Sequence, residues 1–250
     1  MFSNLTPITK NIIIACIIIY VASIVLPGLY NYLPAYYPFS QNFHSWQIIT
    51  HMFMHARLGD GAGILHIAFN LMTLWSFGPI LEHVLGPKRF TILYLLSGLG
   101  AFGLFSLYNI YEVNLLTNQL TEMGVNVAEI FHKANVLDMD SLTYSYKTVE
   151  EGKLQLELYQ NLLSPMLGAS GAIFGVIAAF TTLFPNAEIS LMFIPIPIKA
   201  KVLLPIIIVI SLYLQFSGGM SGIAHLAHVG GALVGFILAS IWKRESFRIN

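Results

Sequence analysis

A serine stands among glycines in Gly168-Ala169-Ser170-Gly171, at the start of an apolar run. Free N–H groups at a helix N-terminus stabilise a developing oxyanion, and glycines let other backbone approach closely, so Ser170 is suited to act as a nucleophile. The alternative is helix packing, because Gly171 and Gly175 have a spacing that lets membrane helices touch. Taken alone, the motif favours packing.

Polar residues in other apolar runs complete a set for acyl transfer. His66 and Asn70 are one helical turn apart and share a face, and His225 and His228 lie in the last apolar run. Singly, a buried histidine or asparagine is usually structural. Together with Ser170, these residues supply a nucleophile, an imidazole base and side-chain donors for an oxyanion. The combined pattern predicts a serine hydrolase site.

Small residues provide a way to bring the serine and the base together. His228 is followed by glycines at a spacing of four, as Ser170 is. Two such faces dock closely, and a serine needs hydrogen-bond contact with its base, so packing and catalysis support each other. The glycines expected at the site are Gly168, Gly171, Gly175, Gly231 and Gly235.

The composition is that of a membrane protein. Of 250 residues, 56% are hydrophobic and 10% charged, against about 25% charged in a soluble domain. The formal net charge is zero, which gives no argument for nucleic-acid binding. The single cysteine, Cys16, excludes an intrachain disulfide.

Apolar runs predict an all-α bundle of six transmembrane helices in one domain, residues 1–250, since about 20 residues cross the hydrocarbon core. The expected spans are residues 11–33, 64–85, 90–111, 170–185, 202–216 and 223–242. The pair Gly86-Pro87 should break the helix between the second and third spans. The aromatic segment 34–63 is expected to lie as a loop in the headgroup region.

Basic residues fix the expected orientation, with both termini inside by the positive-inside rule. Eight of the twelve basic residues fall on one side of the six spans: Lys10, Lys88, Arg89, Lys199, Lys201, Lys243, Arg244 and Arg248. The intramembrane polar residues gather toward the other side, so the active site should open outward. The short N-terminus and simple plan indicate a bacterial inner membrane.

The segment 112–163 is an acidic insert between the third and fourth spans, and it is expected to face outward. Helices are predicted at 148–163, where leucines recur every fourth residue, and at 125–137. The insert could cover the site or contact substrate, but solvated surface is the favoured explanation. We therefore expect it to be dispensable for chemistry.

Four motifs occur in an order typical of one protein family. They are His51-Met52-Phe53-Met54-His55-Ala56, His66-Ile67-Ala68-Phe69-Asn70-Leu71, Gly168-Ala169-Ser170-Gly171 and Ala227-His228-Val229-Gly230-Gly231-Ala232-Leu233-Val234-Gly235. With them the chain resembles the rhomboid intramembrane serine proteases, over residues 46–103 and 167–241.

The resemblance implies a catalytic dyad of Ser170 as nucleophile and His228 as general base, without an acidic third member. His66, Asn70 and the N–H of Ser170 would stabilise the oxyanion. The implied activity is hydrolysis of peptide bonds in or next to transmembrane segments of membrane-protein substrates within the lipid bilayer, with no cofactor or metal. His225 does not have the glycine spacing of the family's base.

Some features differ from the family pattern or suggest other functions. Gln47 follows Trp46 where many members have an arginine, so the role of that arginine does not carry over. His51 and His55 have a metal-ligand spacing but lack a third ligand or carboxylate base. A non-catalytic relative that binds transmembrane helices is the main alternative. A transporter is disfavoured because no internal repeat is found.

Overall fold

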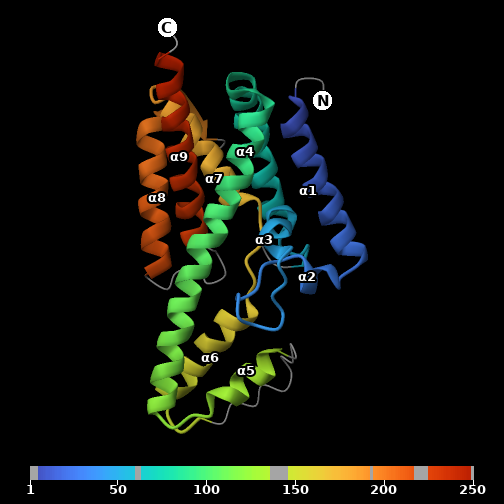
Figure 1. The fold of residues 1–250 in the computed structure, drawn as a ribbon, viewed down its shortest axis with the longest axis vertical. Helices are drawn as coiled ribbons and strands as arrows, with labels where there is room; N and C mark the ends of the chain where they lie inside the picture. The colour runs from blue at the N-terminus through green and yellow to red at the C-terminus, as the bar shows by residue number, and fades with distance from the viewer. Residues whose placement is uncertain (1–4, 60–62, 136–145, 192–193, 217–224, 249–250) are drawn as a thin grey trace.

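The computed structural model describes residues 5–59, 63–135, 146–191, 194–216 and 225–248. It is predominantly helical, and Figure 1 shows long helices packed side by side. The bundle comprises α1 (Pro7–Val25), α4 (Gly63–Glu122), α7 (Ser170–Leu183), α8 (Ala200–Phe216) and α9 (His225–Arg248). The shorter elements are α2 (Leu29–Tyr32), α3 (Gln47–Thr50), the 3₁₀ helix η1 (His51–Phe53), α5 (Val127–Asn135), α6 (Val149–Leu163), β1 (Glu188–Leu191) and β2 (Ile194–Lys199).

Several helices are long and apolar enough to cross a membrane, judged by length and composition alone. Within the described residues these are α1, α4 and the stretch His225–Glu245 of α9, while α7 and α8 contain shorter apolar helices. The start of α1 and the end of α9 lie at the same end of the bundle in Figure 1, and α5 and α6 lie at the opposite end.

Helix α4 contains the second and third expected spans, which meet at a kink. Gly86 has φ 78° and ψ 160°, a left-handed conformation that suits glycine, and Pro87 follows it. Helix α4 does not end at residue 111, the expected limit of the third span, but continues to Glu122. Its last turns stay helical since Val113, Leu116 and Leu120 are buried in a second apolar cluster.

The first expected span, 11–33, has wrong limits. Helix α1 begins earlier, with Pro7 in its first turn, and ends at Val25 before Pro27. Its N-terminus is fixed by Glu82 of α4, whose carboxylate accepts hydrogen bonds from the backbone N–H groups of Ile8 and Thr9 at 2.9 and 2.8 Å. A carboxylate at this place satisfies helix N–H groups that have no partner within the helix.

The other expected limits are closer to the structure. Helix α7 begins at Ser170 as expected and ends at Leu183, while α8 starts two residues before 202. The last helix runs to Arg248, beyond the expected limit of 242, and residues 223–224 lie outside the described part of the chain. The antiparallel hairpin of β1 and β2, in which Glu188 pairs with Lys199, was not expected.

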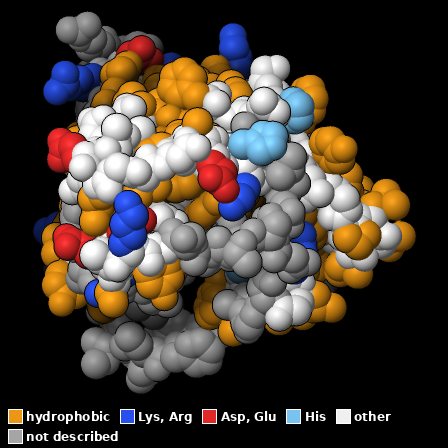
Figure 2. Space-filling view, turned by 90° about the horizontal axis from the view of Figure 1, so that it is seen from below, with side chains coloured by type: hydrophobic (Ala, Val, Ile, Leu, Met, Phe, Trp, Pro, Cys, Tyr) orange, Lys and Arg blue, Asp and Glu red, His pale blue; other side chains and the backbone are white. Residues whose placement is uncertain are grey.

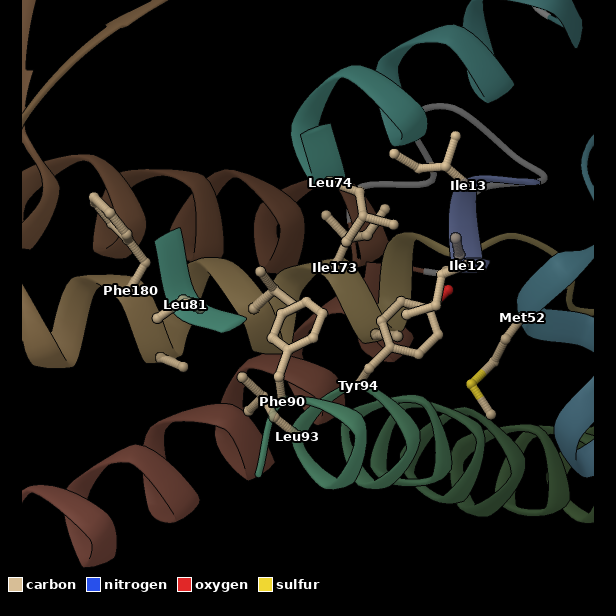
Figure 3. Packing of buried hydrophobic residues seen from close by; sticks show 14 of the residues in the cluster. Ile12, Ile13, Met52, Leu74, Leu81, Phe90, Leu93, Tyr94, Ile173 and Phe180 are labelled. Carbon is tan, nitrogen blue, oxygen red and sulfur yellow. The ribbon is translucent and has the colours of Figure 1, made fainter. Parts of the chain in front are cut away.

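The main apolar core lies where α1, α4 and α7 meet (Figure 3). Phe90, Leu93 and Tyr94 of α4 are essentially inaccessible to solvent. They belong to the same cluster as Ile12 of α1 and Ile173 of α7. This core fixes the position of α7, the helix that begins with Ser170.

A separate unit, here called the extension, consists of residues 112–122 at the end of α4 together with α5 and α6. Its apolar cluster joins Leu116 and Leu120 to Leu158 and Leu162. Helix α6 is capped by the Thr148 hydroxyl, which accepts from the N–H of Glu151 at 3.1 Å. Helices α5 and α6 occupy the segments predicted as 125–137 and 148–163; residues 136–137 lie outside the described part.

Candidate active site

Ser170 and His228 are in hydrogen-bond contact. The Nε2 atom of His228 lies 2.9 Å from the Oγ atom of Ser170. Ser170 is the first residue of α7, after Ala169 at the N-cap position, and His228 is in the first turn of α9. The two helix N-termini therefore bring a hydroxyl and an imidazole together, although 58 residues separate them in sequence.

The close approach of α7 and α9 depends on glycine. A Cβ atom added to Gly231 would lie 1.8 Å from the carbonyl oxygen of Gly171, and one added to Gly235 would lie 2.1 Å from that of Gly175. Backbone thus contacts backbone along this pair of helices, at a separation that no larger residue permits. A Cβ at Gly175 would lie 2.0 Å from the Ser97 hydroxyl of α4 and 2.9 Å from the Gly231 carbonyl oxygen of α9, so three helices meet closely here.

Phe174 is a neighbour of the pair that sequence analysis missed. Its ring stacks on the His228 ring with a centroid separation of 4.2 Å and an interplanar angle of 1°. Phe174 is one helical turn after Ser170, which is a signal that the sequence offered. The rings of His225 and His228 pack edge to face, with their centroids 6.2 Å apart. The Nε2 atom of His225 is buried without a hydrogen bond.

The backbone before Ser170 is held by the loop that precedes α4. Ala35 and Met166 exchange two backbone hydrogen bonds of 2.8 Å, and the Gly168 N–H donates to the His51 carbonyl at 2.9 Å. Gly168 has φ 118°, and a Cβ there would lie 2.9 Å from His66 Nε2. Glycine at 168 therefore permits both the turn and the approach of His66.

His66 and Asn70 lie on one face of α4, as expected, and both line the cavity that contains Ser170. The backbone N–H of Ala56 donates to His66 Nδ1 at 3.3 Å. Asn70 Nδ2 donates to the carbonyl oxygen of His66 at 2.8 Å. Asn70 is buried, with an exposed fraction of 6%.

The cavity has a volume of about 970 Å³ and extends well beyond these residues. One part is lined by His66, Asn70, Ser170 and His228. Another part is lined by the extension and the α4 residues next to it: Asn109, Glu112, Glu157, Gln160 and Asn161. The return of α6 toward α7 thus brings polar residues of segment 112–163 to the cavity wall, and Glu157 and Gln160 remain exposed there.

His51 and His55 are buried and held in the neutral form. Burial lowers the pKa of each to about 4, and for His55 the neighbouring His66 contributes in the same direction. The Nδ1 atom of His51 is 2.8 Å from the Gln47 carbonyl, so it carries the proton and donates it. Within the described residues there is no group of three or more histidine, cysteine or acidic side chains that could hold a metal.

Gln47, which stands where the family often has an arginine, is fully buried and organises the loop. Its Nε2 atom donates to the carbonyl oxygens of Tyr32 and Asn42, at 3.2 and 3.0 Å. Its Oε1 atom accepts from the N–H groups of Tyr36 and His44. A neutral amide here satisfies donors and acceptors alike, which an arginine, having no acceptor, cannot do.

Comparison with known proteins assigns this architecture to a family. Residues 42–117 and 138–245 match the Rhomboid domain. The chain therefore belongs to the rhomboid family, as the four motifs indicated, and is an integral membrane protein. The unmatched stretch 118–137 includes the end of α4 and all of α5.

Individual relatives are distant. The rhomboid proteases GlpG of Salmonella choleraesuis (strain SC-B67) and Salmonella typhi are each 30% identical over 95 residues, which cover 37% of this chain and 32% of the relative. Rhomboid protein 1, mitochondrial, of Saccharomyces cerevisiae is 26% identical over 273 residues, covering all of this chain and 62% of that protein. The chain thus spans about a third of the GlpG proteins it matches.

Proposed function

We propose that this rhomboid is an intramembrane serine endopeptidase that hydrolyses peptide bonds in or next to transmembrane segments of membrane proteins. The observation that carries the proposal is the 2.9 Å contact between His228 Nε2 and Ser170 Oγ. It lies in a cavity large enough for a peptide segment. A serine in contact with an imidazole is the arrangement that activates a hydroxyl for attack.

In the proposed reaction, Ser170 Oγ attacks the scissile carbonyl while His228 Nε2 accepts the hydroxyl proton. His228 then gives that proton to the leaving amine, which leaves an acyl group on Ser170. Water, deprotonated by the same imidazole, hydrolyses the acyl-enzyme. Stacking on Phe174 holds the imidazole in the orientation that the proton transfers require.

Three groups are placed to stabilise the oxyanion. The N–H of Ser170 is in the first turn of α7, where N–H groups lack a partner within the helix. Because Nδ1 of His66 accepts from Ala56, the neutral ring carries its proton on Nε2, the atom that faces Gly168. Asn70 Nδ2 uses one hydrogen for the His66 carbonyl and keeps a second one for the substrate.

For the membrane topology we propose a single domain, residues 1–250, with six spans and both termini inside. Helix α4 supplies two spans, on either side of Gly86. Basic residues lie at the end of the bundle where α1 starts and α9 ends: Arg89 pairs with Glu245, and Lys243 Nζ donates to the Thr182 carbonyl. The positive-inside rule puts this end in the cytoplasm.

The same topology turns the cavity and the extension toward the outer side, where water can enter. We propose the bacterial inner membrane as the location; relatives in bacteria and in mitochondria are both found. A non-catalytic protein that binds transmembrane helices is the alternative. The contact between Ser170 and His228 favours the enzyme, because a binding protein has no need of it.

An activity-based fluorophosphonate tests the nucleophile. The native protein should be labelled, and both Ser170→Ala and His228→Ala should be unlabelled, because the first removes the attacking oxygen and the second its base. Gly103→Ala, at a position with nothing within 4 Å of an added Cβ, serves as the folded control. Labelling that persists in Ser170→Ala would refute the assignment.

A further inference from the structure

The cavity wall formed by α4 and α6 has a chemistry of its own. It is lined by Asn109 and Glu112 of α4 and by Glu157, Gln160 and Asn161 of α6. No lysine or arginine lines the cavity in the part of the chain that the structure describes. This wall concerns the substrate of the same site, so the inference below rests on the proposed function.

Helices α4 and α6 are joined at this wall by a hydrogen bond. Asn109 Nδ2 donates to the Asn161 carbonyl at 3.2 Å. In Figure 1, α4 leads away from the bundle here and α6 returns toward it, so the two run antiparallel. Glu112 follows Asn109 by three residues and Glu157 precedes Asn161 by four. At about 1.5 Å per residue, Glu112 and Glu157 are offset from the bond by about 5 Å along their helices, and both offsets point away from the bundle.

Three side-chain acceptors of this wall have no protein donor in the described part of the chain. Among the described residues, no ion pair involves Glu112 or Glu157. Asn109 is only 4% exposed, and its Oδ1 atom accepts no hydrogen bond. The donation from Nδ2 identifies the other amide atom as the oxygen. Buried acceptors are rarely left without a partner, so the unpaired Asn109 Oδ1 atom and the two carboxylates that line the same cavity point to a ligand that supplies N–H groups and positive charge.

We propose that Asn109, Glu112 and Glu157 form a recognition site for a basic residue, lysine or arginine, that flanks the transmembrane segment of the substrate on the side of α5 and α6. Both side chains carry only donors, which matches a wall of acceptors. Charge-assisted hydrogen bonds to carboxylates are the stronger kind. Figure 2, seen from this end of the molecule, shows acidic side chains scattered among uncharged ones, with several basic side chains on the same face.

Such a site would select among membrane proteins effectively. Lysine and arginine are concentrated in cytoplasmic loops, so a basic residue on the outer flank distinguishes a minority of transmembrane segments. Binding of the flanking residue also leaves the cleavage chemistry unchanged. The recognition site lies on α4 and α6, while Ser170 and His228 lie on α7 and α9. The extension would thereby add substrate specificity to the helix bundle that carries the rhomboid motifs.

The test uses the full chain in vesicles of a neutral phospholipid, with peptides that have one transmembrane segment and differ in one flank residue, lysine or glutamine. The lysine peptide should be cut about tenfold faster at limiting substrate concentration, and added salt should reduce the difference. Each ratio compares two substrates on one enzyme preparation. A partial loss of folded protein lowers both cleavage rates by the same factor and therefore leaves the ratio unchanged.

The variant Glu112→Gln/Glu157→Gln should bring the ratio close to one, since it removes both charges and keeps the side-chain size. Glu157→Lys should reverse the preference toward a glutamate flank. Glu150→Gln is the matched control, because Glu150 is exposed on the same helix and does not line the cavity. It should retain the full preference.

A binding measurement separates this proposal from the proposed function. Fluorescent lysine and glutamine peptides are titrated against Ser170→Ala, which should bind the lysine peptide about tenfold more tightly. Equal affinity, or a preference that survives Glu112→Gln/Glu157→Gln, would overturn the recognition site. A preference abolished by a chelator would assign the wall to a metal and overturn it as well. Preferential binding without hydrolysis by the native protein would support the site and contradict the protease.

Discussion

Two helix contacts in this rhomboid are built on opposite principles. Along α7 and α9, glycines remove the side chains and backbone touches backbone. Between α4 and α6, large leucines fill the space, and a hydrogen bond from Asn109 to Asn161 joins the helices near the cavity. Backbone contact fixes positions that side chains cannot adjust, which suits a dyad. Side-chain packing tolerates repacking, which suits a surface that varies with the substrate.

If the α7–α9 contact positions the dyad and the α4–α6 contact does not, residues of the bundle should control the chemistry. Residues of the extension should then control only local stability. Asn70→Ala should lower the rate of peptide hydrolysis by about ten- to a thousandfold, the range for loss of one oxyanion donor. The measurement is turnover of a transmembrane peptide by protein with an unchanged melting temperature.

Thr73→Ala is the control for Asn70, since Thr73 lines the same cavity and its hydroxyl donates only to the Phe69 carbonyl. Its rate should stay within about threefold of the native rate, as for substitutions away from critical features. Native turnover by folded Asn70→Ala would remove Asn70 from the proposed oxyanion site.

Gly231→Ala tests the backbone contact directly. The added methyl would lie 1.8 Å from the Gly171 carbonyl, so α9 must shift. We expect a loss of about 1–3 kcal/mol in stability from overpacking, and about a hundredfold loss in fluorophosphonate labelling rate from misplacement of His228. Gly103→Ala should be neutral or stabilising. Equal behaviour of the two variants would show that the glycine contact is not what positions the dyad.

Leu158→Ala tests the other contact. Leu158 is fully buried in the apolar cluster between α4 and α6. Its truncation should lower the stability of the extension by about 2–5 kcal/mol. Hydrogen exchange should accelerate in α6 and in residues 113–122, while protection of α7 and α9 stays native. The labelling rate of Ser170 should fall less than in Gly231→Ala. Accelerated exchange throughout the bundle would instead make the extension part of one cooperative unit.

Thr148→Ala should have the smallest effect. It removes the oxygen that caps α6, at a cost of about 1 kcal/mol. Faster exchange should be confined to the first turn of α6. Thr148→Ser is the matched variant, because a serine hydroxyl restores the cap, and it should exchange at the native rate. An equal change in both variants would exclude the cap as the cause.

Much of the bundle was predictable from sequence because membrane spans need long apolar runs and Gly86-Pro87 marks a break. The end of α4 could not be predicted from sequence, because Leu116 and Leu120 pack against residues that come much later in the chain. The hairpin of β1 and β2 was missed since its alternating isoleucines and prolines suggested no regular element. Only the first of these errors comes from a stabilising partner that is distant in sequence, because β1 and β2 are neighbours along the chain.

For the candidate site, residue type and spacing singled out Ser170, His66, Asn70 and the pair His225 and His228, because each carries a polar group in an apolar run. The choice of His228 over His225 as the base rested on the resemblance to the rhomboid motif. Phe174 was missed because an aromatic residue in a membrane helix is ordinary until its stacking on His228 is seen. The contribution of α6 to the cavity was also missed. Its surface is amphipathic and charged, and only the fold shows that residues on one side of it line the cavity that contains Ser170.

The most direct test of the central claim is cleavage by the purified full chain in vesicles. A peptide with one transmembrane segment and a glycine near the expected cut, where a helix unwinds more readily, serves as substrate. Mass spectrometry of the products should show two fragments that join at one peptide bond for the native protein, and intact peptide for Ser170→Ala and His228→Ala. Fragments formed at the native rate by either variant would contradict the account.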